Sequence, residues 1–304
     1  MNKENTNLAA SVRQRLLNRA KETNRPFDEL LQYFAMERFL YRLSRSSYKS
    51  RVVLKGALMF VVWQAPHSRA TRDIDLLGRM PNDVDGLVTM AKQICQVEVE
   101  PDGIVFNIAT VTGERIKEDA DYEGARLRFT GNVGQARVYM QIDIAFGDTL
   151  FPKPVGIDYP TLLGMPHAQL KGYPRETVVA EKFEAMVQLG MLNSRMKDFY
   201  DIWLLAQQFD FDGKTLKKAI EETFANRGTV LTAGPLALSD EFANDREKAA
   251  QWTAFIRTAR LDHAPSEFQA VIELLRDFLL PIATAVAERE TTPSAWKAPG
   301  PWKY

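Results

Sequence analysis

Two aspartates spaced two residues apart, Asp73 and Asp75, are the side chains of this sequence best suited to chemistry. They stand in the stretch Thr71-Arg72-Asp73-Ile74-Asp75-Leu76-Leu77, which predicts a β-strand. Alternate strand residues face one side of a sheet, so both carboxylates would project together while Ile74 and Leu76 face the core. Hard cations such as Mg²⁺ bind a few carboxylate oxygens together with substrate phosphates. The pair therefore predicts a divalent-metal site for phosphoryl or nucleotidyl transfer, although exposed turns also contain this pattern.

A glycine turn precedes the acidic pair. The segment 51–54 predicts a short strand that enters Lys55-Gly56-Ala57, and the apolar run 58–63 predicts a buried helix. Glycine between a strand and a helix lets backbone N–H groups approach an anion. Gly56 is therefore a candidate phosphate-binding residue, with Thr71 and Arg72 as further phosphate contacts.

A third carboxylate, Asp143, stands at the centre of an alternating strand predicted over 137–146. Burial of an unpaired charge is costly, so Asp143 needs a partner. A metal ion shared with Asp73 and Asp75 would supply one, and this interpretation is favoured. A salt bridge with a basic residue is the alternative.

The surrounding pattern predicts an α+β protein with a mixed sheet, an N-terminal helical pair and a C-terminal helical domain. A glycine turn followed by a D-x-D strand resembles the nucleotidyltransferase signature, which implies a nucleotidyltransferase-like mixed sheet. Helices are expected over 8–23, from Pro26 onward and over 84–96, and strands over 104–111, 125–130 and 137–146. Proline and glycine punctuate 151–172, which predicts a linker. The expected organisation has four parts: a helical segment 1–50, a catalytic core 51–150, a helical domain 151–290 that contributes lysine and aspartate to the site, and an irregular tail 291–304 with two tryptophans.

Composition excludes several classes of protein. The 304 residues are 45% hydrophobic and 26% charged, and no run approaches the roughly 20 apolar residues of a membrane span. Cys95 is the single cysteine, the start lacks a signal-peptide pattern, and a cytoplasmic location is expected.

The segment between Glu37 and Asp73 contains basic residues but no acidic residue. This segment predicts either a positive surface for a phosphate-rich substrate or helix residues paired with acids elsewhere.

Five motifs taken together resemble the AbiEii/AbiGii toxin family of nucleotidyltransferases from type IV toxin–antitoxin and abortive-infection systems, which includes the MenT toxins. The motifs are Leu54-Lys55-Gly56-Ala57-Leu58, Thr71-Arg72-Asp73-Ile74-Asp75-Leu76, Gln141-Ile142-Asp143-Ile144-Ala145-Phe146-Gly147-Asp148, Ala180-Glu181-Lys182 and Lys197-Asp198-Phe199-Tyr200-Asp201. The resemblance implies that the D-x-D pair binds catalytic metal, Mg²⁺ or Mn²⁺. It also implies that Lys182 contacts the nucleoside triphosphate (NTP) and that Asp198 completes the site, with Asp201 as a nucleotide-binding neighbour.

The resemblance implies transfer of a nucleoside monophosphate (NMP) from an NTP to an acceptor, with release of pyrophosphate. Asp143 or a metal-bound water would help to deprotonate the acceptor hydroxyl. The implied acceptor is RNA, at the 3′ end of tRNA, and the implied partner is a separately encoded antitoxin, for which no contact is claimed. No membrane partner is expected.

Three other activities fit the same residues. A phosphotransferase would move the γ-phosphate with the same metal site. A catalytically decayed protein would bind nucleotide or RNA without transfer, and Ala57 supports this alternative because the family usually has glycine or serine there. A metal-dependent nuclease would cut RNA without NTP and is the least favoured.

Overall fold

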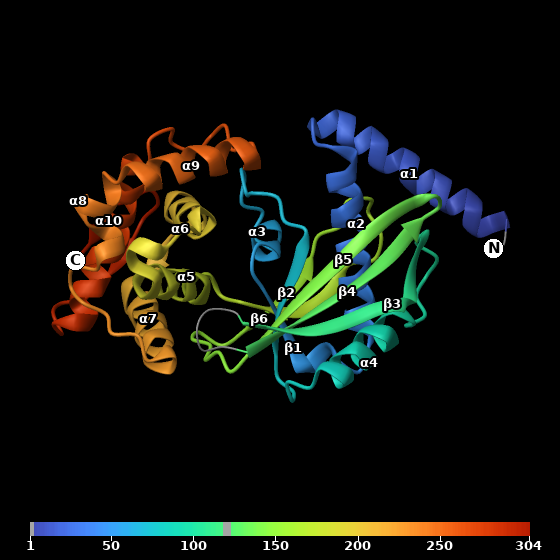
Figure 1. The fold of residues 1–304 in the computed structure, drawn as a ribbon, viewed down its shortest axis with the longest axis horizontal. Helices are drawn as coiled ribbons and strands as arrows, with labels where there is room; N and C mark the ends of the chain where they lie inside the picture. Colours follow the sequence, from blue (N-terminus) through green and yellow to red (C-terminus); the bar gives the residue numbers. More distant parts are fainter. Residues whose placement is uncertain (1–2, 118–122) are drawn as a thin grey trace. The chain divides into compact units, whose positions relative to one another are not determined.

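The computed structural model describes residues 3–117 and 123–304 (Figure 1). Internal contacts divide the chain into two compact units. Unit 1 comprises residues 1–64, 70–147 and 155–172, and unit 2 comprises residues 65–69, 148–154 and 173–304.

Two helices open unit 1, α1 (Lys3–Thr23) and α2 (Phe27–Arg45), as the apolar spacing predicted. Pro26 precedes the first turn of α2, where its missing N–H has no intrahelical partner to lose. The acidic side chains of Asp28 and Glu29 in that first turn stabilise the positive end of the helix dipole.

Seven strands of the described chain form the mixed sheet of unit 1, in the order β3-β4-β5-β2-β1-β7-β6. Their bounds are β1 (Val52–Lys55), β2 (Asp73–Gly78), β3 (Ile104–Lys117), β4 (Glu123–Val133), β5 (Ala136–Phe146), β6 (Val155–Tyr159) and β7 (Ala168–Gly172). Strand β2 runs parallel to β5 and antiparallel to β1, while β1 runs parallel to β7. The α+β architecture is therefore confirmed.

The prediction of a linker over 151–172 was wrong. Strands β6 and β7 form an antiparallel pair, and β7 extends the sheet beside β1. Their burial alternates over only five residues each, and the flanking prolines hide so short a signal.

Helices α2 and α4 (Val84–Cys95) cover one face of the sheet. The ring of Phe39 on α2 packs on Phe129 of β4, with centroids 5.5 Å apart. Strand pairing places Phe129 on the face that also carries Ile74 and Ile142, both fully buried. Side chains alternate between the two faces along a strand, so Asp73 and Asp75, which flank Ile74, face the opposite side of the sheet.

The basic segment divides between buried and exposed positions. The side chains of Arg38 and Arg42 on α2 are buried, and Arg42 makes two hydrogen bonds of 2.6 and 3.1 Å to the carboxylate of Asp102. These two arginines correspond to the alternative in which helix residues pair with acids elsewhere. Arg45 and Arg72 are exposed.

Unit 2 is mainly helical. Its helices are α5 (Arg175–Leu189), α6 (Met196–Gln208), α7 (Gly213–Arg227), α8 (Asp240–Ala243), α9 (Arg246–Ala259) and α10 (Phe268–Ala287). Aromatic rings of Phe199, Phe242 and Phe268 meet between α6, α8 and α10, with centroids 5.3–6.0 Å apart. Burial of such rings is a large apolar contribution to the stability of this unit.

The C-terminal tail is not irregular, in contrast to the prediction. Strands β9 (Ala295–Trp296) and β10 (Trp302–Lys303) join β8 (Phe211–Asp212) in a small sheet. The indole N–H groups of Trp296 and Trp302 donate to the carbonyls of Ala206 and Phe278 at 2.8 and 2.9 Å. The tail thus packs on unit 2 through both indoles. Among the described helices, none has the length and apolar character that crossing a bilayer requires.

Candidate active site

Strand pairing brings the three predicted aspartates together on the polar face of unit 1. In the parallel pair β2–β5, Asp73 lies beside Gln141 and Asp75 lies beside Asp143. In the antiparallel pair β5–β4, Asp143 lies beside Arg126, and in the pair β1–β2, Lys55 lies beside Asp75. One row across four strands therefore reads Lys55, Asp75, Asp143 and Arg126, with a basic residue at each end.

Gly56 brings the backbone of the turn against the carboxylate of Asp75. Its φ of +68° is a left-handed conformation that side-chain-bearing residues rarely adopt. A Cβ atom at this position would lie 1.9 Å from Asp75 Oδ2, so a side chain cannot be accommodated while Asp75 keeps its position. The helix that follows, α3 (Leu58–Val62), is as short and apolar as the sequence predicted.

Replacement of Gly56 by alanine is expected to displace the Asp75 carboxylate and to strain the turn. The positive φ alone costs about 1 kcal/mol, and the displaced carboxylate adds to that cost. We expect thermal unfolding of Gly56→Ala at a temperature several degrees lower and a loss of any activity that depends on Asp75. Gly164→Ala is the matched control, because Gly164 also has a φ of +68° but its Cβ would meet open space. Equal behaviour of the two variants would contradict a specific role for the contact with Asp75.

Asp143 has a basic partner in unit 1. The guanidinium of Arg126 donates two hydrogen bonds to its carboxylate, from Nε at 2.8 Å and from Nη2 at 2.7 Å. The Gln141 side-chain amide donates a further, longer bond of 3.3 Å. The hydrogen bonds to Asp143 raise the pKa of Arg126, whose burial opposes the shift. The salt bridge that the sequence left as an alternative is therefore formed, and a role for Asp143 as third metal ligand stays a prediction.

Thr71 and Arg72 lead into β2. The Thr71 backbone N–H donates to the phenol oxygen of Tyr33 at 3.1 Å, and the Arg72 carbonyl accepts from the Gln32 side chain at 3.2 Å. Both partners lie on α2, which therefore fixes the start of the strand that carries Asp73. The Arg72 side chain is exposed and can meet a phosphate in solution.

The chemistry of the donor set suits a hard cation. Mg²⁺ usually takes one or two carboxylates plus substrate phosphates, and the D-x-D pair offers such a set on one face of β2. A group of three or more His, Cys, Asp or Glu residues suited to a metal does not occur within residues 3–117 and 123–304.

Unit 2 assembles the other predicted residues. Lys182 on α5 places its Nζ 2.5 Å from Asp198 Oδ1 and 2.9 Å from Asp201 Oδ2, both on α6. Arg195 lies 2.7 Å from the second oxygen of Asp198, and Arg69 donates two hydrogen bonds of 3.0 Å to Asp201. Lys182, Arg195 and Arg69 thus surround the two carboxylates of α6 in one cluster of ion pairs.

Burial and charge act in opposite directions on the pKa values of this cluster. Burial alone would lower the pKa of Lys182, but the carboxylates of Asp198 and Asp201 outweigh it and raise that pKa. Burial alone would raise the pKa of Asp198, but Lys182 and Arg195 lower it to about 2. Lys182 is therefore a permanent cation at neutral pH, and its side chain is 14% exposed.

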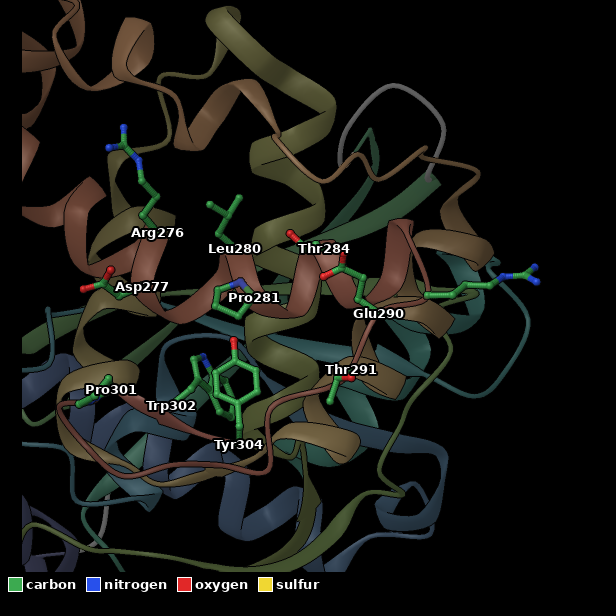
Figure 2. Close-up of a pocket in the computed structure, with 11 residues that line it drawn as sticks. Arg276, Asp277, Leu280, Pro281, Thr284, Glu290, Thr291, Pro301, Trp302 and Tyr304 are labelled. Carbon is green, nitrogen blue, oxygen red and sulfur yellow. The ribbon is translucent and has the colours of Figure 1, made fainter.

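A cavity of about 860 Å³ in unit 2 lies between α10 and the C-terminal tail (Figure 2). Leu280, Pro281 and Thr284 of α10 line it together with Trp302 and Tyr304 of the tail. None of the predicted site residues lines this cavity. Its size alone assigns it no role in nucleotidyl transfer.

Sequence reasoning missed the basic partners of the aspartates. Arg126 and Arg69 were not predicted as partners of aspartates, because ion pairs between residues far apart in sequence leave no periodic signal. Pairing of Asp198 or Asp201 with Arg195 was the sequence alternative to a catalytic role, and Arg195 does contact Asp198. Arg126 carried one weak signal, since it occupies a polar position between the buried residues Ala125 and Leu127 of β4. Lys182, Asp198 and Asp201 were predicted from motif resemblance, and the structure brings them together within unit 2.

A mixed sheet that carries a glycine turn beside a D-x-D strand, followed by a helical unit, defines a nucleotidyltransferase-like protein. The model of the family described as nucleotidyl transferase AbiEii toxin, type IV toxin–antitoxin system, matches residues 38–274. The chain therefore belongs to the AbiEii nucleotidyl transferase toxin family.

Two solved structures from Helicobacter pylori are similar to the chain. JHP933 shares 12% identity over 86% of this chain and 92% of its own, with a TM-score of 0.48. A proposed nucleotidyltransferase shares 12% identity over 86% of this chain and 95% of its own, with a TM-score of 0.47. No curated protein matches the sequence.

Proposed function

We propose that this protein is a metal-dependent nucleotidyltransferase that transfers NMP from an NTP to the 3′ end of tRNA and releases pyrophosphate. The observation that carries the proposal is the polar row of unit 1, in which Asp75 lies beside Asp143 and against the backbone of Gly56. Family membership supports nucleotidyl transfer. The acceptor and the metal are the parts that experiment must establish.

Mg²⁺ or Mn²⁺, when bound by Asp73 and Asp75, would supply electrostatic stabilisation of the phosphate oxygens on which charge develops. The residues of the chain do the rest. The acceptor hydroxyl oxygen attacks the α-phosphorus, the bond between the α-phosphorus and its bridging oxygen breaks, and pyrophosphate carries away the electron pair. Asp143 is the proposed acceptor of the hydroxyl proton, through a carboxylate lone pair that the hydrogen bonds from Arg126 and Gln141 leave open.

Lys182 is proposed to bind the triphosphate. A compact cation offsets the charge that builds on leaving pyrophosphate, and the raised pKa and partial exposure of Lys182 support this role. Asp198 would hold Lys182 in position through the 2.5 Å contact. Asp201, which also contacts Lys182, is the proposed nucleotide-binding neighbour of Asp198. Gly56, Thr71 and Arg72 are the proposed additional phosphate contacts.

The antitoxin implied by the family is proposed as the neutralising partner, with no contact surface assigned to it. A cytoplasmic location is proposed as well. The alternative of γ-phosphate transfer uses the same residues and differs only in which phosphorus is attacked.

Incubation of the purified protein with total RNA, Mg²⁺ and each NTP in turn tests the proposed function. We expect label from the α-phosphate to enter RNA of tRNA size and to require the divalent ion. Transfer of label from the γ-phosphate alone would establish the phosphotransferase alternative instead. RNA cleavage without NTP would establish a nuclease, and binding without any transfer would establish a decayed enzyme.

A further inference from the structure

A second pocket, of about 350 Å³, lies in unit 1 on the same polar face as the aspartate pair. Asp73 and Gln141 line it at one end, and Arg128, Thr130 and Tyr139 line it across β4 and β5. Its size is near the lower limit for small-molecule sites and gives room for one nucleotide, not for a duplex. The pocket therefore begins at the predicted catalytic carboxylates and continues away from them along the sheet.

The aspartate pair separates this pocket from the glycine turn. Gly56 contacts Asp75 from the β1 side, whereas Gln141 lies beside Asp73 on the β5 side. A transferase that joins two substrates needs a place for each of them on either side of the reacting phosphorus. Because Gly56 in the glycine turn is a proposed contact of the triphosphate, the pocket on the other side of the aspartate pair is left for the acceptor.

Tyr139 gives the pocket an accessible aromatic surface. Its side chain is 68% exposed, which is unusual for a large ring on a central strand. The Arg137 guanidinium lies 5.1 Å from its ring centroid, and the Gln32 side chain donates to its carbonyl at 3.0 Å. The Arg137 guanidinium thus contacts the ring and the Gln32 bond fixes the backbone that carries it, while the side chain stays accessible to a stacked base.

Positive charge accompanies this ring. The side chains of Arg72 and Arg128 line the pocket, and Arg137 stands next to Tyr139. Arg128 pairs with Glu114 at 2.5 Å, but both side chains are about half exposed, so water screens this ion pair. A phosphate can replace the carboxylate as the partner of such a pair. An aromatic ring among arginines is the combination that recognises single-stranded nucleic acid.

We propose that the pocket at Asp73 binds the terminal nucleotide of a single-stranded RNA acceptor, with its base stacked on Tyr139 and its phosphates at Arg128 and Arg137. The inference rests on the proposed function and specifies its acceptor. Thr110 and Thr130 also line the pocket, and their hydroxyls share a hydrogen bond of 3.2 Å. The lone pairs that this bond leaves open are hydrogen-bond acceptors for a ribose 2′-hydroxyl. A paired end would not bind in this way, because its bases are already stacked within the duplex.

Fluorescence anisotropy with a labelled six-nucleotide single-stranded RNA, in EDTA and without NTP, tests the proposal independently of transfer. We expect Tyr139→Ala to weaken binding by about tenfold or more, the usual effect of loss of one base–aromatic stack. Tyr139→Phe keeps the ring and should stay within about threefold of the wild type. The control is Tyr304→Ala, which removes another tyrosine, 79% exposed in unit 2, and should leave binding unchanged. Arg128→Gln should lower the slope of log affinity against log salt by about one.

Transfer kinetics distinguish failure of this inference from failure of the proposed function. In the labelled-NTP assay, Tyr139→Ala should raise the KM for RNA with little change in kcat. If the wild type labels RNA while Tyr139→Ala binds and reacts as the wild type does, the acceptor site is elsewhere and the inference is overturned. Weakened binding of NTP in place of RNA would also overturn it, since the pocket would then hold the donor. Absence of transfer by the wild type would refute the proposed function. The anisotropy measurement would still show whether the pocket binds single-stranded RNA.

Discussion

Asp75→Asn is expected to abolish nucleotide transfer while the protein stays folded. Asparagine keeps the size that fits against Gly56 but removes the negative charge that would hold a divalent cation. Cations in such sites contribute several kcal/mol of transition-state stabilisation, and each 1.36 kcal/mol is a factor of ten in rate. We therefore expect transfer to fall by roughly a thousandfold or more. Incorporation of α-phosphate label into RNA measures the rate, and thermal unfolding checks the fold.

The matched control is Asp85→Asn, which makes the same change at an exposed aspartate in the first turn of α4. This variant should transfer label at the wild-type rate. Retention of more than a tenth of the wild-type rate by Asp75→Asn would contradict the assignment of Asp75 as a metal ligand. The result would then leave the aspartate pair with a structural role on the polar face.

Lys182→Met is expected to have the second largest effect, again on transfer more than on stability. Methionine keeps most of the length of the side chain but removes its positive charge. Arg195 still pairs with Asp198, and Arg69 still pairs with Asp201, so both buried carboxylates keep a basic partner. We expect transfer to fall by about a hundredfold or more, because a cation at the leaving group is lost. Stability should fall by about 1–3 kcal/mol, as for loss of hydrogen bonds to a charged group.

The acid limit of stability should also move in Lys182→Met. The pKa of Asp198 is about 2 in the folded protein, below its ordinary value of 3.8. A carboxylate whose pKa is lowered by folding stabilises the fold above its unfolded pKa, and this stability is lost as pH falls toward the folded pKa. The window is therefore between about pH 4 and pH 2. Without Lys182 the folded pKa of Asp198 rises, so acid unfolding should begin at higher pH.

Lys217→Met is the matched control for both measurements. Lys217 is a partly exposed lysine of unit 2, 3.5 Å from Glu221 on the same helix, and has no contact with the cluster residues among its described interactions. It should match the wild type in transfer and in the midpoint of acid unfolding. Wild-type transfer by Lys182→Met would show that the lysine serves only to neutralise Asp198 and Asp201.

The sequence by itself determined the helices and the strands β1 to β5, together with the acidic pair on β2. The apolar residues alternate in β2 and β5 and recur at helical spacing in α1, α2 and α4. These patterns reflect whether each side chain faces water or the core, and they can be recognised within each short segment of sequence. The same alternation placed Asp73 and Asp75 on one face of β2. Motif order then indicated the nucleotidyltransferase class, which the family match confirms.

Only the tertiary structure decided which distant residues meet. Strand order brought Arg126 to Asp143 and Lys55 beside Asp75, and it incorporated β6 and β7 into a sheet where prolines had indicated a linker. The partners of Lys182 and the presence of Tyr139 and Asp73 in one pocket likewise depend on strands and helices far apart in sequence. The physical reason is that periodicity records the environment of each residue but not the identity of its neighbour. Pairing between elements is fixed when the whole core packs.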